Sequence, residues 1–223
     1  MPGVWIIAET GEQVFELLGA GRLPAADMGA ALTVVVSKGS AEPGECIARG
    51  ADEVLLLAGL PPGEPFGAHL PVLEQEARAA SPDVILFSAT ARGKETAARL
   101  AARLGAGLCS ACTAISFDKA AGAIVMERIA YGGAATQKIT SSARPVLVTV
   151  PPRSFEPAQA LDGRQGKSRE LPAPPPSAVK IVERKPKEKV AKDITEARVI
   201  VCAGRGFDKK EDLALARQLA DAL

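Results

Sequence analysis

The stretch DVILFSATARGKETAARLAARL, residues 83–104, combines a buried strand with an amphipathic helix. Asp83–Phe87 is a short apolar run that follows Ser81-Pro82, as expected for a strand covered on both faces. Gly93–Leu104 repeats apolar residues at helical spacing, and these lie on one face: Ala97, Leu100, Ala101 and Leu104. The stretch therefore predicts a strand followed directly by a helix that packs on it.

The same alternation extends back to the N-terminus. Apolar runs predict strands at Val4–Ala8, Leu32–Val36 and Glu53–Leu57. The segments between them predict helices, and their ranges are Glu12–Leu23, Cys46–Gly50 and Ala68–Ala80. Val14, Leu17, Leu18 and Leu23 give the first helix its apolar spacing. Strands that alternate with helices indicate right-handed βαβ units, and hence a three-layer, Rossmann-like α/β domain (adenine-nucleotide-hydrolase-like) with a mostly parallel sheet.

The periodicity changes after Leu104. Gly107–Phe117, Ala123–Ile129 and Val146–Val150 read as successive strands with no helix between them, which predicts an antiparallel or mixed extension at the edge of the sheet. Pro151-Pro152 ends this domain, predicted to span residues 1–152. Residues 153–192 are rich in Pro, Lys and Glu and predict a linker, with Ala178–Val182 as one added strand.

Residues 193–223 predict the start of a second α/β domain. Arg198–Cys202 reads as a strand, Ala203–Phe207 as a tight glycine loop and Asp208–Leu223 as a helix. Asp208 and Glu211 have the spacing of a capping box at the start of that helix. A single strand-helix unit needs neighbours to pair with, so we expect the rest of the domain to lie outside this sequence or on another chain.

The composition of the sequence argues against several classes of protein. Hydrophobic residues make up 47% of the 223 residues and the net charge is +1, which favours a globular core and gives no field that attracts nucleic acid. Four scattered cysteines do not make a disulfide framework. No signal peptide is recognisable, and no apolar run approaches the ~18 residues of a membrane span. We expect a cytoplasmic protein, or a matrix protein if it is mitochondrial.

Two loops could contact phosphate. Gly204-Arg205-Gly206 lets the backbone approach an anion, and Arg205 adds a cation; a simple tight turn explains the same pattern equally well. Thr90, Arg92 and Lys94 follow a predicted strand, where open α/β sheets bind ligands. We favour the simpler interpretation, a helix N-cap with solvated cations, because this loop lacks the glycines of a P-loop.

The other candidates predict structural roles. Cys109 and Cys112 have the spacing of a redox motif but fall in a predicted strand, so we interpret them as buried thiols. His69 is the only histidine, which excludes a His-dependent triad, and we expect it on a helix surface. Tyr131-Gly132-Gly133 reads as a turn that could meet a ligand or partner, and Arg144-Pro145 as a strand entry. Nothing predicts a hydrolytic or acid–base active site, and no metal site is expected.

In their order along the chain, several blocks resemble the α subunit of electron-transfer flavoproteins. The resemblance covers essentially the whole sequence, and the blocks that carry it are Leu17–Arg22, Gly50–Val54, Phe87–Lys94, Leu100–Leu108, Tyr131-Gly132-Gly133, Arg144-Pro145, and Asp193–Ala197 with Gly204-Arg205-Gly206. The first two are similar to a helix and a strand entry of that family. The last is similar to the opening of its flavin-binding domain.

The resemblance implies a heterodimer with a β subunit and an FAD held mainly by the C-terminal domain of the α subunit. Such a complex passes electrons from acyl-CoA or other flavoprotein dehydrogenases to a quinone oxidoreductase. It implies that Arg205, with Gly204 and Gly206, belongs to the flavin site, and that the N-terminal domain is a scaffold that docks the β subunit. The 223-residue chain is then expected to bind little or no FAD by itself. Two alternatives remain: a free-standing adenine-nucleotide-binding module that uses Thr90, Arg92 and Lys94, and a docking domain only.

Overall fold

A computed structural model describes residues 3–141, 144–183, 185, 194 and 197–223. The chain divides into two compact units, Met1–Val182 and Glu183–Leu223. Within the described residues, no helix is long and apolar enough to cross a membrane.

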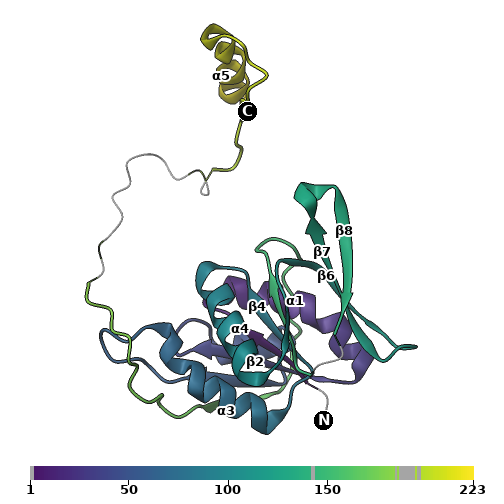
Figure 1. Cartoon of the computed structure of the whole chain (residues 1–223), viewed down its shortest axis with the longest axis vertical. Coiled ribbons are helices and arrows are strands. Elements are labelled where there is room, and N and C mark those ends of the chain that lie inside the picture. The colour runs from purple at the N-terminus through teal and green to yellow at the C-terminus, as the bar shows by residue number, and fades with distance from the viewer. Residues whose placement is uncertain (1–2, 142–143, 184, 186–193, 195–196) are drawn as a thin grey trace. The chain divides into compact units, whose positions relative to one another are not determined.

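A parallel sheet of seven strands forms the centre of the first unit (Figure 1). Its strand order is β10-β3-β2-β1-β4-β9-β5, and every described pair in it is parallel. The strands are β1 (Gly3–Ile7), β2 (Ala31–Ser37), β3 (Glu53–Leu57), β4 (Val84–Ser88), β5 (Gly107–Cys109), β9 (Val146–Val150) and β10 (Lys167–Glu170). The predicted parallel α/β fold is confirmed.

Helices cover both faces of this sheet. They are α1 (Gly11–Met28), α2 (Pro43–Ala48), α3 (Leu70–Ala80, after a 3-10 turn at Phe66–His69) and α4 (Ala91–Leu104). Side chains of β1 alternate between the two faces: Val4 and Ile6 pack with α1 and α2, whereas Trp5 and Ile7 pack with α3 and α4. This alternation produces the three layers.

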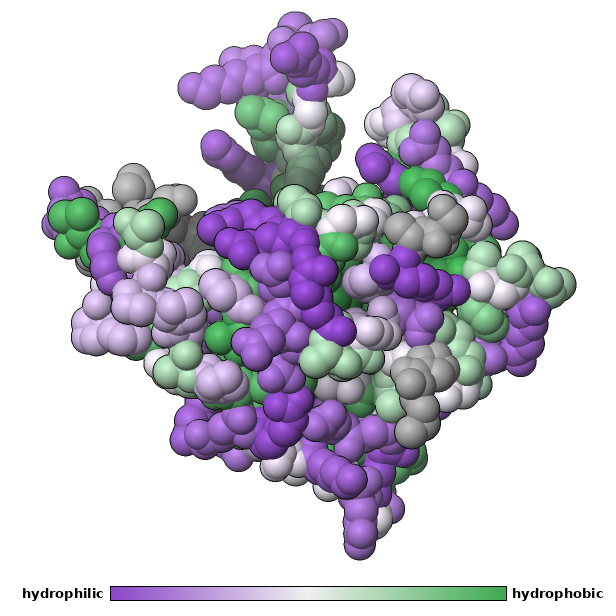
Figure 2. Space-filling model, turned by 60° about the horizontal axis from the view of Figure 1, so that its bottom comes forward, coloured by the Kyte–Doolittle hydropathy of each residue, from purple (hydrophilic) through white to green (hydrophobic). Residues whose placement is uncertain are grey.

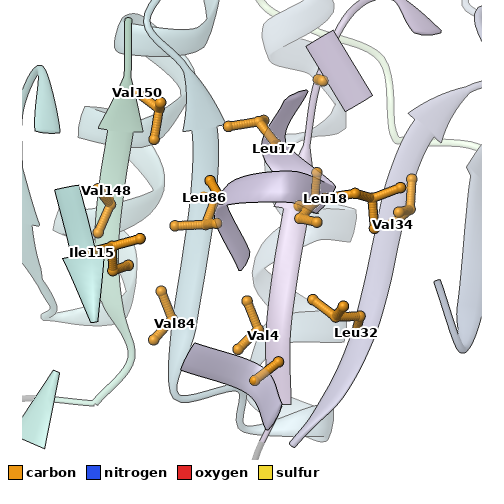
Figure 3. Packing of buried hydrophobic residues seen from close by; sticks show 14 of the residues in the cluster. Val4, Leu17, Leu18, Leu32, Val34, Val84, Leu86, Ile115, Val148 and Val150 are labelled. Carbon is orange, nitrogen blue, oxygen red and sulfur yellow. The ribbon is translucent and has the colours of Figure 1, made fainter. Parts of the chain in front are cut away.

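Helix α1 is longer than predicted, and its buried face differs. The helix continues through Pro24 and ends at Met28; the C-cap residue Gly29 has a φ of +61°, and its N–H bonds to the carbonyls of the last turn. Leu17 and Leu18 point onto the sheet near Val34 and Leu86 (Figure 3). Leu23 does not belong to this stripe, because 71% of its surface is exposed.

The prediction for the strands after Leu104 needs two corrections. Val146–Val150 is β9, which lies inside the parallel sheet between β4 and β5. Gly107–Phe117 is two strands, because the chain turns after Cys109 and enters a second sheet at Cys112. An apolar run is compatible with either strand direction, so the sequence pattern does not distinguish these arrangements.

The second sheet has three antiparallel strands in the order β6-β7-β8. These are β6 (Cys112–Asp118), β7 (Ala123–Ala130) and β8 (Ala135–Thr140). Ile115, Ile124 and Met126 bury its inner face against α1 and the large sheet. Strand β8 was not predicted, because four of its six residues are polar and most of them are exposed.

Residues 153–182 run along the first unit as an extended strap. Its added strand is β10, at Lys167–Glu170 beside β3, and not the predicted Ala178–Val182, which forms no strand. Ala158 and Leu171 are buried in the two halves of the core. Backbone bonds hold both ends: the N–H of Ala158 donates to the Phe15 carbonyl (2.8 Å) and the N–H of Ile181 donates to the Gly63 carbonyl (2.7 Å).

Ion pairs accompany the strap. Arg164 pairs with Asp52 at 2.6 Å, Arg169 with Glu53 and Glu76 at 3.1 and 2.7 Å, and Lys180 with Glu64. The Glu64 side chain is buried, whereas the pairs of Arg164 and Arg169 are partly exposed and each contributes at most about 1 kcal/mol. The buried side chains and backbone bonds therefore fix the strap more firmly than these ion pairs. On the face drawn in Figure 2 the surface is mostly hydrophilic, with hydrophobic residues in small scattered groups.

The second unit contains one helix among its described residues, α5 (Leu213–Ala222), preceded by a 3-10 turn at Lys210–Asp212. The predicted helix start at Asp208 is therefore wrong by five residues. Arg198–Cys202 is not a strand, since a strand needs a neighbour to pair with and the described part of this unit offers none. The lead-in Asp193–Ala197 lies largely outside the described residues.

Candidate functional site

The strand order of the large sheet reverses between β1 and β4. In open α/β sheets, ligands bind in the crevice at the carboxyl ends of the strands on either side of such a point. Glu9 follows β1 at this edge, and Thr90 and Arg92 follow β4, at the start of α4. These three side chains meet in the crevice.

The carboxylate of Glu9 binds both neighbours. It accepts a hydrogen bond from the Thr90 hydroxyl (2.5 Å) and forms an ion pair with Arg92 (2.9 Å). The Thr90 hydroxyl also accepts the N–H of Gly93 (2.9 Å), which makes Thr90 the N-cap of α4, as predicted. The Glu9 carboxylate therefore occupies the place in the crevice where the phosphate of a ligand would otherwise contact Thr90 and Arg92. Sequence reasoning missed Glu9, although its position directly after the first strand was a signal.

Little space remains around these groups. The cavity measures about 10 Å³ and is lined mainly by Ile7, Glu9, Phe66, Phe87, Ser88 and Arg92. That is about the smallest volume that holds one water molecule. The Arg92 guanidinium also lies over the Phe66 ring, 5.5 Å from its centroid, and Lys94 is exposed on the first turn of α4. This geometry argues against a nucleotide phosphate bound by Thr90, Arg92 and Lys94.

Replacement of Glu9 by glutamine tests whether this carboxylate holds the crevice together. The variant keeps the shape but leaves Arg92 without its counter-charge, so we expect the free energy of unfolding to fall by about 1 kcal/mol in urea denaturation. Glu42→Gln is the matched control, because Glu42 is exposed and its side chain makes no capping bond. Equal stability of the two variants would contradict the role assigned to Glu9.

His69 is not on a helix surface, contrary to the prediction. It ends the 3-10 turn Phe66–His69, only 1% of its surface is exposed, and its ring meets Phe66 edge-on at 5.3 Å between centroids. Its Nδ1 has no hydrogen-bond partner among the described residues. Burial lowers the pKa of His69, so the ring is held neutral in the core.

Tyr131-Gly132-Gly133 forms the predicted turn, between β7 and β8. All three residues have positive φ, and 82% of the Tyr131 surface is exposed. Arg144 stands at the predicted strand entry, before β9, where it pairs with Asp83 at 3.1 Å and donates to the Gly122 carbonyl. Arg144 is therefore a structural contact between two strand ends.

Cys109 and Cys112 are brought together, although they do not share one strand. Cys109 ends β5 and Cys112 begins β6, and both are buried in the same hydrophobic cluster. The Cys112 thiol donates to the Ala114 carbonyl oxygen (2.9 Å), and each of the two thiols shifts the pKa of the other. Among the described residues, no group of three or more His, Cys, Asp or Glu side chains is arranged to hold a metal ion.

Gly204-Arg205-Gly206 forms an exposed turn in the second unit. The N–H of Phe207 donates to the Gly204 carbonyl (3.3 Å), and neither glycine has an atom within 4 Å of the place where a Cβ would stand. The turn precedes α5 by several residues, so Arg205 lies outside the first turn of this helix. The turn leaves room for close approach of a ligand to the backbone.

Comparison with known proteins identifies the class. Residues 4–176 match the family described as the electron transfer flavoprotein domain. The chain is 32% identical to Protein FixB of Clostridium saccharobutylicum, over 99% of this chain and 69% of that protein. It is 30% identical to the electron transfer flavoprotein subunit alpha of Clostridium acetobutylicum, over 99% of this chain and 70% of that protein.

The chain therefore belongs to the electron transfer flavoprotein domain family. A third relative, the electron transfer flavoprotein subunit alpha of Bacillus subtilis, is 30% identical over 68% of this chain and 45% of that protein. Within the family the chain is of the alpha type, as its resemblance to α subunits predicted.

Proposed function

We propose that this chain acts in the cytoplasm as the α subunit of an electron-transfer flavoprotein. Paired with a β subunit, it passes electrons through FAD from acyl-CoA or other flavoprotein dehydrogenases to a quinone oxidoreductase. The observation that carries the proposal is the similarity to proteins of the alpha type across 99% of this chain.

The two units take different parts in this function. The first unit is the scaffold that docks the β subunit, a role supported by its filled crevice, in which Glu9 already neutralises Arg92. In the second unit, residues 193–223 begin the flavin-binding domain. The open turn at Gly204-Arg205-Gly206 supports this assignment, because an exposed cation between two glycines suits the pyrophosphate of FAD.

Co-expression with the β subunit of the source organism tests the pairing. We expect the two chains to elute together from gel filtration as a heterodimer, whereas the 223-residue chain alone elutes without flavin absorbance. Calorimetric titration of the chain alone with AMP should give no binding heat. Separate elution of the two chains, or tight AMP binding by this chain, would refute the proposal.

Arg205 is tested within a complex that holds FAD. Loss of a charge-assisted hydrogen bond costs about 1.5–3 kcal/mol, so Arg205→Ala should weaken FAD retention by at least about tenfold. Arg217→Ala is the matched control, since Arg217 lies on α5 of the same unit. The measurement is the ratio of flavin to protein absorbance after dialysis. Equal retention in the two variants would remove Arg205 from the site.

A further inference from the structure

The chain turns sharply between Cys109 and Cys112. In one continuous strand, residues three apart point to opposite faces. Here Ser110 and Ala111 interrupt the strand, and Ala111 takes a φ of +55°. The turn directs both side chains into one hydrophobic cluster, where 3% of Cys109 and none of Cys112 is exposed.

Hydrogen bonds hold this turn in place. The N–H of Ala111 donates to the hydroxyl of Thr149 (2.9 Å), and Thr149 is fully buried near the end of β9. The Cys112 sulfur lies 2.9 Å from the Ala114 carbonyl oxygen, and its interaction with Cys109 shifts the pKa of both thiols. The backbone therefore keeps the two sulfur atoms next to each other.

A positive charge lies beside the pair. Arg128 is opposite Cys112 in the register of β6 and β7, and its charge acts on Cys109. The Nε atom of Arg128 is buried and has no hydrogen-bond partner among the described residues. Arg128 as a whole is half-buried, and a nearby anion stabilises the buried part of its guanidinium group. The Cys109 thiolate would provide that anion.

The two thiols consequently differ in acidity. The hydrogen bond from Cys112, helped by Arg128, lowers the pKa of Cys109 to about 7 although burial opposes this. The same hydrogen bond and burial raise the pKa of Cys112. By contrast, burial raises the pKa of Cys46 to about 11, so that thiol stays protonated. An unequal pair of this kind supplies one nucleophile and one resolving thiol.

We propose that Cys109 and Cys112 form a redox-active dithiol that reacts with hydroperoxides. The Cys109 thiolate attacks one oxygen of the peroxide; an S–O bond forms, the O–O bond breaks, and hydroxide leaves and takes up a proton. The Cys112 sulfur then attacks the Cys109 sulfur, which forms the S–S bond and breaks the S–O bond, and water leaves with the Cys112 proton. The dithiol loses two electrons, and hydrogen peroxide is reduced to two water molecules.

Burial selects the oxidant. An organic disulfide must bring its sulfur in line with the attacking thiolate, and almost no surface of Cys109 is open to such a bulky group. Hydrogen peroxide is little larger than water and enters through small local openings. The resulting disulfide would join the end of β5 in the large sheet to the start of β6 in the small one.

The test uses the whole 223-residue chain carrying Cys202→Ser, which removes the exposed thiol. The reduced protein is treated with hydrogen peroxide, denatured, alkylated and mapped by mass spectrometry without reductant. We expect a Cys109–Cys112 disulfide that dithiothreitol reverses, while Cys46, equally buried, remains a free thiol. The pair should react at least about tenfold faster than Cys46. Oxidation of all three cysteines at one rate would overturn the proposal.

Two further measurements separate the steps. In Cys112→Ala, the sulfenic acid of Cys109 should persist and be trapped by dimedone, whereas Cys109→Ala should leave Cys112 unreactive. Glutathione disulfide, applied to the same folded protein, should leave the pair reduced. If glutathione disulfide oxidises the pair as fast as peroxide does, the assignment of a hydroperoxide is wrong. Mapping of the protein with both cysteines intact decides the main question even if a variant fails to fold.

Discussion

Replacement of Gly93 by alanine is expected to lower the free energy of unfolding by about 3 kcal/mol. The first turn of α4 closes so tightly over the end of β4 that a Cβ at Gly93 would stand 1.9 Å from the Ser88 carbonyl oxygen. Both groups are fixed by the backbone, so relief requires a shift of the helix, and overpacking of this kind costs about 1–3 kcal/mol or more. The same shift would disturb the contact of Thr90 with Glu9.

Gly44→Ala is the matched control for Gly93→Ala. Gly44 also lies near the start of a helix, α2, but nothing stands within 4 Å of the place its Cβ would occupy. Alanine favours helix by up to about 1 kcal/mol over glycine, so we expect stability to stay the same or rise slightly. Urea denaturation of the two variants measures the contrast. A loss of stability in Gly44→Ala as large as in Gly93→Ala would show that the close approach is not the cause.

Leu18→Ala is expected to destabilise the first unit by about 2–5 kcal/mol, the range for leucine in a packed core. Leu18 is fully buried in α1 and points onto the sheet near Val34 and Leu86 (Figure 3). Its truncation leaves a cavity between the helix and the strands. These strands are held on their other face by α3 and α4, so we expect little collapse into the space.

Leu23→Ala, further along the same helix, is the control. With 71% of its surface exposed, Leu23 should tolerate truncation with a change below about 0.5 kcal/mol. Thermal denaturation followed by circular dichroism compares the two variants. A similar loss for both would mean that the helix itself, and not the packing of Leu18, limits stability.

Local patterns predicted most of the large sheet. Glu53–Leu57 was predicted with the bounds that β3 has, and Asp83–Phe87 lies within one residue of β4. These runs are largely apolar, because their strands are covered on both faces, and such runs are visible in sequence. Strand β8 lacks this signal: its residues mostly face solvent, and only pairing with β7 makes it a strand.

The candidate sites were harder to predict from sequence than the strands, because they depend on contacts between residues that are distant in the chain. Thr90 was predicted as an N-cap from its position alone, and the structure confirms that role. Its partner Glu9 is 81 residues away, and only the parallel pairing of β1 with β4 brings the two together. The pairing of Cys109 with Cys112 was missed because a strand pattern says nothing of a positive φ at Ala111.

The sequence by itself determined the class of the fold and the family, because both rest on local order: apolar runs, helical spacing and the succession of motifs from Leu17 to Gly206. Tertiary structure alone decided which strand lies beside which. Val146–Val150 is an inner strand because it pairs with β4 and β5. The crevice is occupied by a long-range ion pair between Glu9 and Arg92. Such pairings depend on contacts between distant residues, whose energies no local window of sequence contains.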